Sequence, residues 1–343
     1  MKILLPGGSG QIGAVLARRF AAAGHEVVVF TRSPQRAPAG PARVVGWDGR
    51  TVGDWAQELD GADAVINLAG RSVNCRYHAA NRAAILNSRL DSTRALGEAF
   101  VACQNPPPVW LQSSTATIYP HTTEPPGNTE ADPIGNRPNP PDTWAFSFDV
   151  ASRWEETAES FRPQLEATRL VLMRTAIVMS PDRGGAFEVF YNLVKARLGG
   201  RQGSGQQFVS WIHDADLYAA VDRLIADETL AGPVNLAAPN PLPNAAFMAA
   251  LREAAGVRFG LPATAGMIEL GAVALRTESE LVLKSRRVIP GKLADAGFTF
   301  QYPDWPAAAR DLVARYRGDS RERRAEEPSR RAGSAGRSLT GSA

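Results

Sequence analysis

The sequence predicts an α/β protein built on a doubly wound, parallel β-sheet. Short apolar runs rich in β-branched residues alternate with helical patterns over the first half of the chain, as such a sheet requires. A glycine-rich loop joins the first apolar run to the first helical pattern. With 343 residues, of which 44% are hydrophobic, the chain is long enough to bury a large core.

The expected elements follow one another regularly up to residue 177. Strands are predicted at residues 2–5, 26–30, 43–46, 64–68, 109–113 and 169–173. Helices are predicted between them, including residues 12–23, 79–103 and 148–161. Beyond residue 177 the alternation loosens and Pro and Gly recur. We therefore expect a core at residues 1–231 and a smaller, mixed C-terminal domain at residues 232–316, on the substrate side of the sheet.

Residues 317–343 form a third predicted region, a disordered tail. This segment has too few apolar side chains to offset its ordering entropy by burial. It holds seven arginines and four acidic residues, a balance of +3 that equals the formal charge of the whole chain. The remainder is therefore formally neutral. Because the tail also lacks the aromatic side chains that accompany a basic nucleic-acid site, we expect no nucleic-acid partner.

No part of the chain has the pattern of a membrane segment. No apolar stretch reaches the roughly 18 residues that a membrane helix needs, and the first strand leads into the glycine loop without the plan of a signal peptide. We expect a cytoplasmic protein with no membrane partner. The two cysteines, Cys75 and Cys103, lack metal-ligand spacing and are expected to be reduced thiols. The sequence favours no particular oligomeric state.

The loop PGGSGQIG is the strongest functional motif. Gly7, Gly10 and Gly13 have the spacing GxxGxxG, and a helix begins after them at Gln11 or Ile12. In a strand, loop and helix of this kind, the glycines let the backbone approach a pyrophosphate, and the amides at the helix N-terminus bind it. The loop therefore predicts a dinucleotide site in a Rossmann-type core.

The end of the second strand indicates which dinucleotide binds. An NAD site carries Asp or Glu there for the ribose hydroxyls, whereas this chain has Thr31 and Arg32. A guanidinium at this point pairs with a 2′-phosphate, a contact worth roughly 1.5 to 3 kcal/mol. We expect NADP(H) as the cofactor. The alternative is that Arg32 is a solvated charge at the strand end.

Taken together, the motifs resemble the extended short-chain dehydrogenase/reductase superfamily, and within it the atypical epimerase-family branch with an extra, DUF1731-like C-terminal domain. The resemblance spans residue 1 to about residue 315. Besides the glycine loop, it rests on VINLAGRSV, ILNSRLDST, QSSTATIY, RTAIVMSPDRGGAF, FVSWIHDADL, GPVNLAAPNPLPNAAF and VIPGKLADAGFTFQYPD. It implies a Rossmann core, NADP(H) binding, and oxidoreductase or epimerase activity on a small molecule, with nucleotide-sugar-like compounds among the candidates.

The resemblance also implies further cofactor contacts. Leu68 and Ala69, at the end of the fourth strand, are expected beside the adenosine ribose. Arg89, on the next helix, is expected to reach the phosphates, with a surface charge as the alternative. Residues 176–178, with Ile177 at their centre, are expected against the nicotinamide.

The expected catalytic set departs from the superfamily. Thr115 occupies the position of the usual Ser or Thr, with a hydroxyl able to hold a substrate carbonyl. The usual Tyr and Lys, which shuttle a proton, are missing from the next helix. When Trp154 and Glu155 fix the register of that helix, Ser147 stands at the Tyr position and Ala151 at the Lys position. A conventional tyrosine-driven mechanism is therefore not expected.

Three side chains are candidate replacements for the missing acid. Tyr119 and His121 follow the fifth strand, and Asp149 lies on the next helix. We take Tyr119 as the second catalytic candidate beside Thr115. The alternatives are that Tyr119 packs in the core and that Asp149 is a helix-surface charge.

The stretch FVSWIHDADL contains a further group of titratable side chains. His213, Asp214 and Asp216 could form an acid/base pair or a metal site. We favour a structural role, with Asp216 as the N-cap of a helix, and expect no metal.

Two function classes remain open. One is an NADP-dependent oxidoreductase or epimerase with unusual proton chemistry. The other is a binding protein that senses NADP(H) and has lost turnover.

Overall fold

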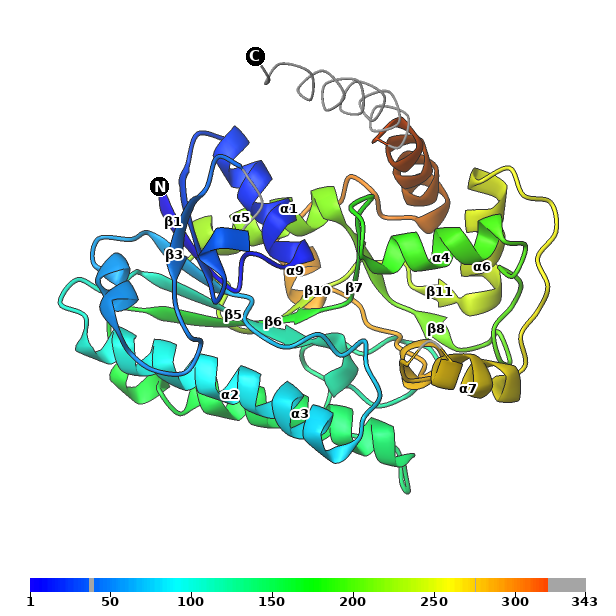
Figure 1. The fold of residues 1–343 in the computed structure, drawn as a ribbon, viewed down its shortest axis with the longest axis horizontal. Coiled ribbons are helices and arrows are strands. Elements are labelled where there is room, and N and C mark those ends of the chain that lie inside the picture. The colour runs from blue at the N-terminus through cyan, green and yellow to red at the C-terminus, as the bar shows by residue number, and fades with distance from the viewer. Residues whose placement is uncertain (37–39, 275, 320–343) are drawn as a thin grey trace, which may run out of the picture.

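A seven-stranded, all-parallel sheet lies at the centre of the protein (Figure 1). The computed structural model describes residues 1–36, 40–274 and 276–319. In spatial order the strands are β10 (Gly232–Leu236), β6 (Arg169–Thr175), β5 (Val109–Thr115), β4 (Ala64–Asn67), β1 (Lys2–Pro6), β2 (Glu26–Thr31) and β3 (Arg43–Gly46). The order reverses beside β1, so loops at the carboxyl ends of β1 and β4 diverge there and leave a crevice.

The predicted α/β fold and its first six strands are confirmed. Each predicted strand is present, and its bounds differ by at most two residues from the expected ones. The inner strands are buried on both faces, with Ile3 and Leu5 facing one apolar cluster and Leu4 facing the other. Continuous apolar runs of this kind are typical of parallel strands covered by helices on both sides.

Helices cover both faces of the sheet (Figure 1). On one face, α1 (Gln11–Ala22) and α5 (Asp214–Ala226) contribute Phe20 and Leu224 to a shared core. On the other face lie α2 (Ala79–Ala102) and α3 (Asp142–Glu159), which pack against each other. α3 begins six residues before the predicted start. Its N-cap is Pro141, and Asp142 places an acidic side chain in the first turn, where the helix dipole favours it.

The seventh strand lies at the start of the segment that the sequence assigns to the C-terminal domain. Residues 232–236 form β10 and pair with β6 over their whole length. The Gly-Pro pair at its start resembles a turn in the sequence. Pro233 is tolerated because β10 is an edge strand, where one side of the backbone needs no ladder partner. By its hydrogen bonds, this strand belongs with the core.

A second packing centre lies beside the sheet. It joins α4 (Ala186–Lys195), α6 (Asn244–Ala254) and a helix at residues 305–319, with Trp305 stacked on Phe247 at a ring distance of 4.1 Å. Two small sheets border it. One pairs β7 (Ile177–Met179) with β9 (Trp211–His213), and the other pairs β8 (Phe208–Val209) with β11 (Leu242–Pro243).

The rest of the C-terminal segment runs from this centre back towards the core. It contains α7 (Ala265–Ala274), α8 (Glu280–Leu283) and α9 (Gly291–Asp295). Residues 284–288 bring the chain to the loop after β5, where Ser285 N donates to His121 Nδ1 at 3.0 Å. The segment therefore reaches the loop that follows the carboxyl end of β5.

The predicted tail is partly ordered at its start. Residues 317–319 continue the last helix, and Arg317 donates to the Tyr191 hydroxyl and to the carbonyl of Ala255. The expected disorder of the tail concerns residues 320–343, which lie outside the described residues.

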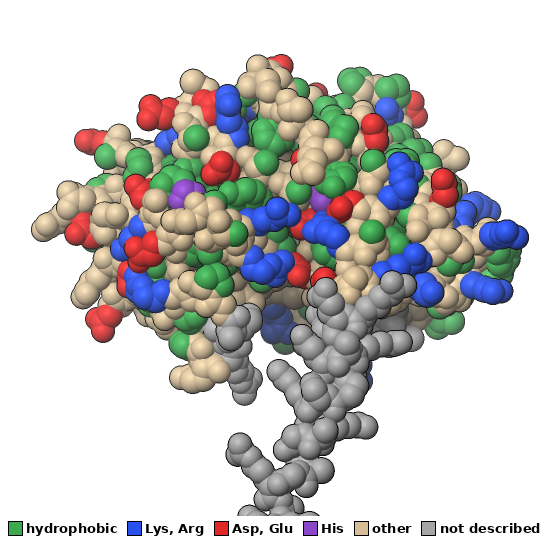
Figure 2. Space-filling view, turned by 90° about the horizontal axis from the view of Figure 1, so that it is seen from above, with side chains coloured by type: hydrophobic (Ala, Val, Ile, Leu, Met, Phe, Trp, Pro, Cys, Tyr) green, Lys and Arg blue, Asp and Glu red, His purple; other side chains and the backbone are tan. Residues whose placement is uncertain are grey.

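Two further observations concern the surface and the helices. On the face shown in Figure 2, Lys and Arg side chains are interspersed with Asp and Glu side chains. Within the described ranges, every helix is too short or too polar to cross a bilayer.

Candidate nucleotide-binding and active site

The glycine loop forms a tight turn between β1 and α1. Gly7 has a φ of 75°, and a Cβ atom there would lie 2.6 Å from the Cα atom of Ala69. A Cβ atom on Gly13 would lie 2.3 Å from the carbonyl oxygen of Gly8. Only glycine fits at these two positions. The loop is held against the second strand by a hydrogen bond of 3.0 Å from Gly7 N to the carbonyl of Phe30.

The start of α1 is suited to an anionic ligand. The helix begins at Gln11 after the N-cap Gly10, and its first turn carries no acidic side chain. The amides of a first helical turn have no partners within the helix and carry the positive end of the helix dipole. In addition, Gln11 Nε2 is buried without a hydrogen-bond partner among the described residues. A buried donor left in this state is costly unless a ligand satisfies it.

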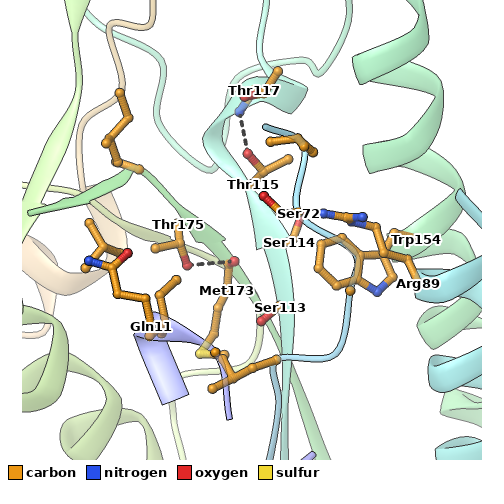
Figure 3. A pocket seen from close by; sticks show the side chains of 18 of the residues that line it. Gln11, Ser72, Arg89, Ser113, Ser114, Thr115, Thr117, Trp154, Met173 and Thr175 are labelled. Carbon is orange, nitrogen blue, oxygen red and sulfur yellow. Dashed lines mark hydrogen bonds between the residues drawn. The ribbon is translucent and has the colours of Figure 1, made fainter. Parts of the chain in front are cut away.

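A cavity of about 500 Å³ extends from this loop along the carboxyl ends of the strands. Figure 3 shows Gln11 on one side, Arg89 and Trp154 on the opposite side, and Thr115 at the end of β5 between them. The cavity continues to Ser147 on α3 and to two side chains of the C-terminal segment, Glu280 and Arg286. Elements far apart in the sequence therefore meet in one crevice.

Most of the expected cofactor-binding residues line this cavity. They are Gly7, Gly10, Gln11, Ile12, Gly13, Leu68, Arg89 and Ile177. Ala69 lies directly behind Gly7. Thr31 and Arg32 lie outside the cavity wall at the end of β2. The Thr31 hydroxyl accepts from Ser33 N, and the Arg32 side chain is exposed. Since Gly7 bonds to the same strand end, Arg32 stands next to the loop.

Arg89 is held in place without a counter-charge. Its guanidinium lies 4.9 Å from the centre of the Trp154 ring and donates to the carbonyls of Arg71 and Ile85. Burial lowers the pKa of Arg89 to about 10. In the described part of the chain, no carboxylate forms an ion pair with it. A cation in this setting favours a negatively charged ligand in the cavity.

Thr115 is positioned to donate a hydrogen bond. It ends β5, and its Oγ1 accepts from Thr117 N at 3.2 Å (Figure 3). Because that contact uses a lone pair, the hydroxyl proton is free to point into the cavity.

The two positions at which the sequence register places the usual Tyr and Lys differ in their surroundings. Ser147 lines the cavity, and its hydroxyl donates to Glu280 Oε2 at 2.6 Å. Ala151 is fully buried in an apolar cluster with Ile118 and Tyr119. Elsewhere the chain does contain a Tyr-x-x-x-Lys pattern, Tyr191 and Lys195 on α4. Neither of these two residues lines the cavity, and Lys195 is exposed.

Tyr119, our second catalytic candidate, is not placed for proton transfer. It is almost fully buried outside the cavity wall, and its hydroxyl lies 2.9 Å from both Asn235 Oδ1 and Arg174 Nη1. Burial raises the pKa of Tyr119. The tyrosine therefore packs in the core, the alternative considered from the sequence.

The other proposed replacements have structural contacts. Asp149 is exposed and pairs with Arg153 at 3.7 Å, one turn along α3. His121 accepts a hydrogen bond from Ser285 N and stacks on Trp144, with a ring distance of 5.0 Å. Burial lowers the pKa of His121.

The His213 cluster anchors the last helix. His213 itself caps α5, because its Nδ1 accepts from Ala215 N, and its Nε2 lies 3.0 Å from Asp311. Asp214 forms an ion pair with Arg315. The expectation that Asp216 is the N-cap is wrong: its carboxylate accepts from the amides of Gln301 and Tyr302 instead.

The residues that sequence reasoning missed come from the C-terminal segment. Arg286 donates from Nε to Thr117 Oγ1 at 3.0 Å, and Lys284 Nζ donates to the Thr117 carbonyl at 2.8 Å. Glu278 accepts from Tyr77 N at 2.6 Å. In the sequence these charges resemble a solvated surface segment. Their burial depends on contacts with residues more than 130 positions away, which no local pattern reveals.

Comparisons with known proteins agree with this architecture. Residues 3–237 match the model of the NAD dependent epimerase/dehydratase family, and residues 266–312 match DUF1731, a domain of unknown function. The chain is 30% identical over 317 residues to the epimerase family protein SDR39U1 of Homo sapiens, which covers 92% of this chain and 100% of that protein. It is 31% identical over 317 residues to the epimerase family protein SAR0825 of Staphylococcus aureus (strain MRSA252), which covers 91% and 99%.

Solved structures show the same fold. The crystal structure of human SDR39U1 (isoform 2) with NADPH superposes with a TM-score of 0.78 at 28% identity, over 92% of this chain and 99% of that one. A nucleoside-diphosphate sugar epimerase from Corynebacterium glutamicum has a TM-score of 0.68 at 23% identity, over 96% of this chain and 68% of that one. This chain belongs to the NAD dependent epimerase/dehydratase family.

Proposed function

We propose that the protein binds NADP(H) along this cavity and acts as an oxidoreductase or epimerase on a small molecule with a carbonyl or hydroxyl group. The observation that carries the proposal is the continuity of the cavity from Gly10, at the start of α1, to Thr115 and Ser147. A cofactor bound along it would have its phosphates at one end and its reactive ring at the other.

Three features fit the nucleotide end of the proposed cofactor. Gly7 and Gly13 permit the tight turn of the loop, because a Cβ atom at either position would overlap the backbone of Ala69 or Gly8. The buried Gln11 Nε2 donor lacks a partner among the described residues. Arg89 is a cation on the cavity wall, and no carboxylate of the described residues pairs with it. Each of these supports a ligand with phosphate groups.

A preference for NADP(H) over NAD(H) is part of the proposal. Arg32 stands at the end of β2, where an acid would favour NAD. The human relative SDR39U1 was crystallised with NADPH. The description of the family model refers to NAD.

At the other end of the cavity, the residues that could take part in the reaction would contact the substrate oxygen. When bound, the nicotinamide would donate or accept a hydride. Ile177 and Ala176 form the wall against which its ring would lie. Thr115 would hold the substrate oxygen through its free hydroxyl proton and stabilise negative charge that develops there. Neither Ser147 nor Ala151 can supply a proton as the usual Tyr does, because a serine hydroxyl is too weak an acid and an alanine has none.

A second candidate is an NADP(H)-binding protein without turnover. The observation that favours it is the burial of Ala151 in an apolar cluster, at the position where the sequence register expects the usual Lys. The cytoplasmic location expected from the sequence stays a prediction under either function.

One experiment separates the two candidates. The protein is first titrated calorimetrically with NADPH and with NADH. It is then loaded with NADPH and incubated with a panel of carbonyl compounds and nucleotide sugars, while the reduced nicotinamide absorbance and epimer formation are followed. Tight NADPH binding with turnover supports the enzyme. Tight binding without turnover on the whole panel supports the sensor, and absence of NADPH binding contradicts both.

A further inference from the structure

The C-terminal segment places a buried carboxyl group in the cavity. Glu280, the first residue of α8, is only 1% exposed and lines the same cavity as Thr115 and Ser147. This carboxyl group takes part neither in the proposed cofactor contacts nor in the proposed role of the Thr115 hydroxyl. An acid buried in an active-site cavity has an energetic cost, and such costs are concentrated at functional sites.

The two oxygens of Glu280 have different surroundings. Oε2 accepts the hydrogen bond from Ser147 at 2.6 Å. Oε1 is also buried, yet it has no hydrogen-bond partner among the described residues. The nearest cation, Arg286 Nη2, is 3.7 Å from Oε1, too far for a hydrogen bond. The other nitrogens of Arg286 are directed to Thr117 Oγ1 and to the carbonyls of Glu280 and Lys284. One carboxyl oxygen of a residue that lines the cavity therefore has no hydrogen-bond partner among the described residues.

Glu280 also lies where the missing acid is needed. Ser147, its hydrogen-bond donor, stands at the position of the superfamily Tyr in the register fixed by Trp154. Arg286 links the same segment to Thr117, whose amide donates to Thr115. The carboxyl group and the Thr115 hydroxyl thus belong to one connected network on the cavity wall.

The surroundings of Glu280 favour its protonated form. Burial raises its pKa, and the neighbouring charge of Glu278 acts in the same direction. Arg286, Lys284 and the Ser147 hydroxyl act against it but do not reverse the shift. Tyr77, also on the cavity wall, is a poorer donor near neutral pH, because burial raises its pKa to about 12.

We propose that Glu280 is the general acid and base of this site, in place of the missing tyrosine, and that Ser147 positions it. The proposal rests on the proposed NADP(H)-dependent function. In the reduction of a carbonyl, the carbon receives the hydride from the reduced nicotinamide, and the oxygen receives the proton from Glu280 Oε1. The C=O double bond becomes an alcohol, the nicotinamide is oxidised, and the carboxylate takes a proton from water before the next turnover. In oxidation every transfer runs in reverse.

The first test measures the protonation of Glu280 without any turnover. Infrared spectra are recorded over a pH series, and the carboxylic acid C=O band lost in Glu280→Gln is followed. We expect the band to titrate with a midpoint above about 4.3, the ordinary value for glutamate. A midpoint at or below that value overturns the proposal. Glu269→Gln, the same change at an exposed site of α7, is the matched control and should not remove the band.

The second test measures turnover. With a carbonyl substrate found in the panel, Glu280→Gln should lower the rate about a hundredfold or more, the scale of general acid catalysis. NADPH affinity should stay within about twofold, and Glu269→Gln should behave like the wild type. If Glu280→Gln turns over normally, this inference fails while the proposed enzyme stands. If the wild type binds NADPH but converts no compound in the panel, the enzyme proposal fails and this role falls with it.

A further variant covers the case in which Glu280→Gln does not fold. The Ser147 hydroxyl lowers the pKa of Glu280, so Ser147→Ala should raise it. The reduction rate needs the protonated acid and falls as pH rises through that pKa. The alkaline limb of the pH–rate profile should therefore move to higher pH in Ser147→Ala. A limb that stays in place, with only the overall rate changed, contradicts a proton-transfer role for Glu280.

Discussion

The two ends of the cavity are built in different ways. At the nucleotide end, consecutive residues of one loop create the site through backbone shape, with Gly7 and Gly13 permitting contacts that a Cβ atom would block. At the reactive end, side chains from β5, α3 and the C-terminal segment come together, namely Thr115, Ser147 and Glu280. The comparison teaches that the glycine loop at the proposed binding end depends on local sequence, whereas the proposed reactive end depends on how the last third of the chain packs against the core.

The largest expected effect is a change of backbone shape at the nucleotide end. Gly13→Ala should lower the free energy of unfolding by about 1 to 3 kcal/mol, the usual cost of overpacking, because its Cβ atom would lie 2.3 Å from the Gly8 carbonyl oxygen. It should also weaken NADPH binding strongly. Denaturant unfolding and calorimetry measure the two effects. Gly10→Ala is the matched control for stability only, since its Cβ atom meets nothing closer than 3.6 Å. Equal losses of stability in both variants would contradict the steric explanation.

Arg32→Ala tests the one side chain proposed to select the cofactor at that end. Loss of a charge-assisted contact of about 1.5 to 3 kcal/mol should weaken NADPH binding roughly 10-fold to 150-fold. NADH binding should be unchanged, because it has no 2′-phosphate. Arg310→Ala removes an exposed charge from the last helix and serves as the control. Unchanged NADPH affinity in Arg32→Ala would remove the basis for the cofactor preference.

At the reactive end, Thr115→Val should separate catalysis from binding. We expect a rate more than about tenfold lower with NADPH affinity within about twofold, because the hydroxyl acts on the developing charge of the substrate. Valine also loses the hydrogen bond from Thr117 N, so stability has to be measured alongside. Thr115→Ser keeps the hydroxyl and should restore most of the rate. Normal turnover in Thr115→Val would place the chemistry elsewhere.

These differences explain what the sequence could predict. The glycine loop and the first six strands depend on neighbouring residues, so their patterns could be interpreted directly. The surroundings of Tyr119 could not be predicted, because its hydroxyl is held by Asn235 and Arg174, 116 and 55 positions away. Glu280 was missed for the same reason, since its partner Ser147 is 133 positions distant. A charged segment such as TESELVLKSRR has the same appearance whether it faces water or a cavity.

The buried carboxyl at the reactive end should also affect stability in a pH-dependent way. Because the folded-state pKa of Glu280 is raised, the unfolded chain loses this proton first as pH rises, and the wild type is destabilised. A difference of one between the folded and unfolded pKa corresponds to about 1.4 kcal/mol. The stability of Glu280→Gln relative to the wild type should therefore increase between about pH 4 and pH 7. Thermal unfolding of both proteins across this range measures it, and a flat difference would mean that folding leaves the pKa unchanged.

The smallest effect is expected from removing the end of the chain. A cut after Asp319 keeps every described contact of the last helix and should change the unfolding free energy by less than about 0.5 kcal/mol. A cut after Tyr316 also removes the hydrogen bonds from Arg317 to Tyr191 and Ala255, and should cost about 0.5 to 1.5 kcal/mol. A clear loss of stability or NADPH binding after the cut at Asp319 would show that residues 320–343 dock on the body.

A crystal structure of the NADPH complex tests the central claim most directly, namely that one cofactor joins the two ends of the cavity. We predict phosphates on the amides of Gln11 and Ile12, the 2′-phosphate beside Arg32, and the nicotinamide ring against Ile177. A carbonyl placed about 3 to 3.5 Å from the reactive ring carbon should then reach both Thr115 and Glu280. A nicotinamide bound away from these side chains, or one with a Tyr and a Lys beside its ribose, would contradict the account.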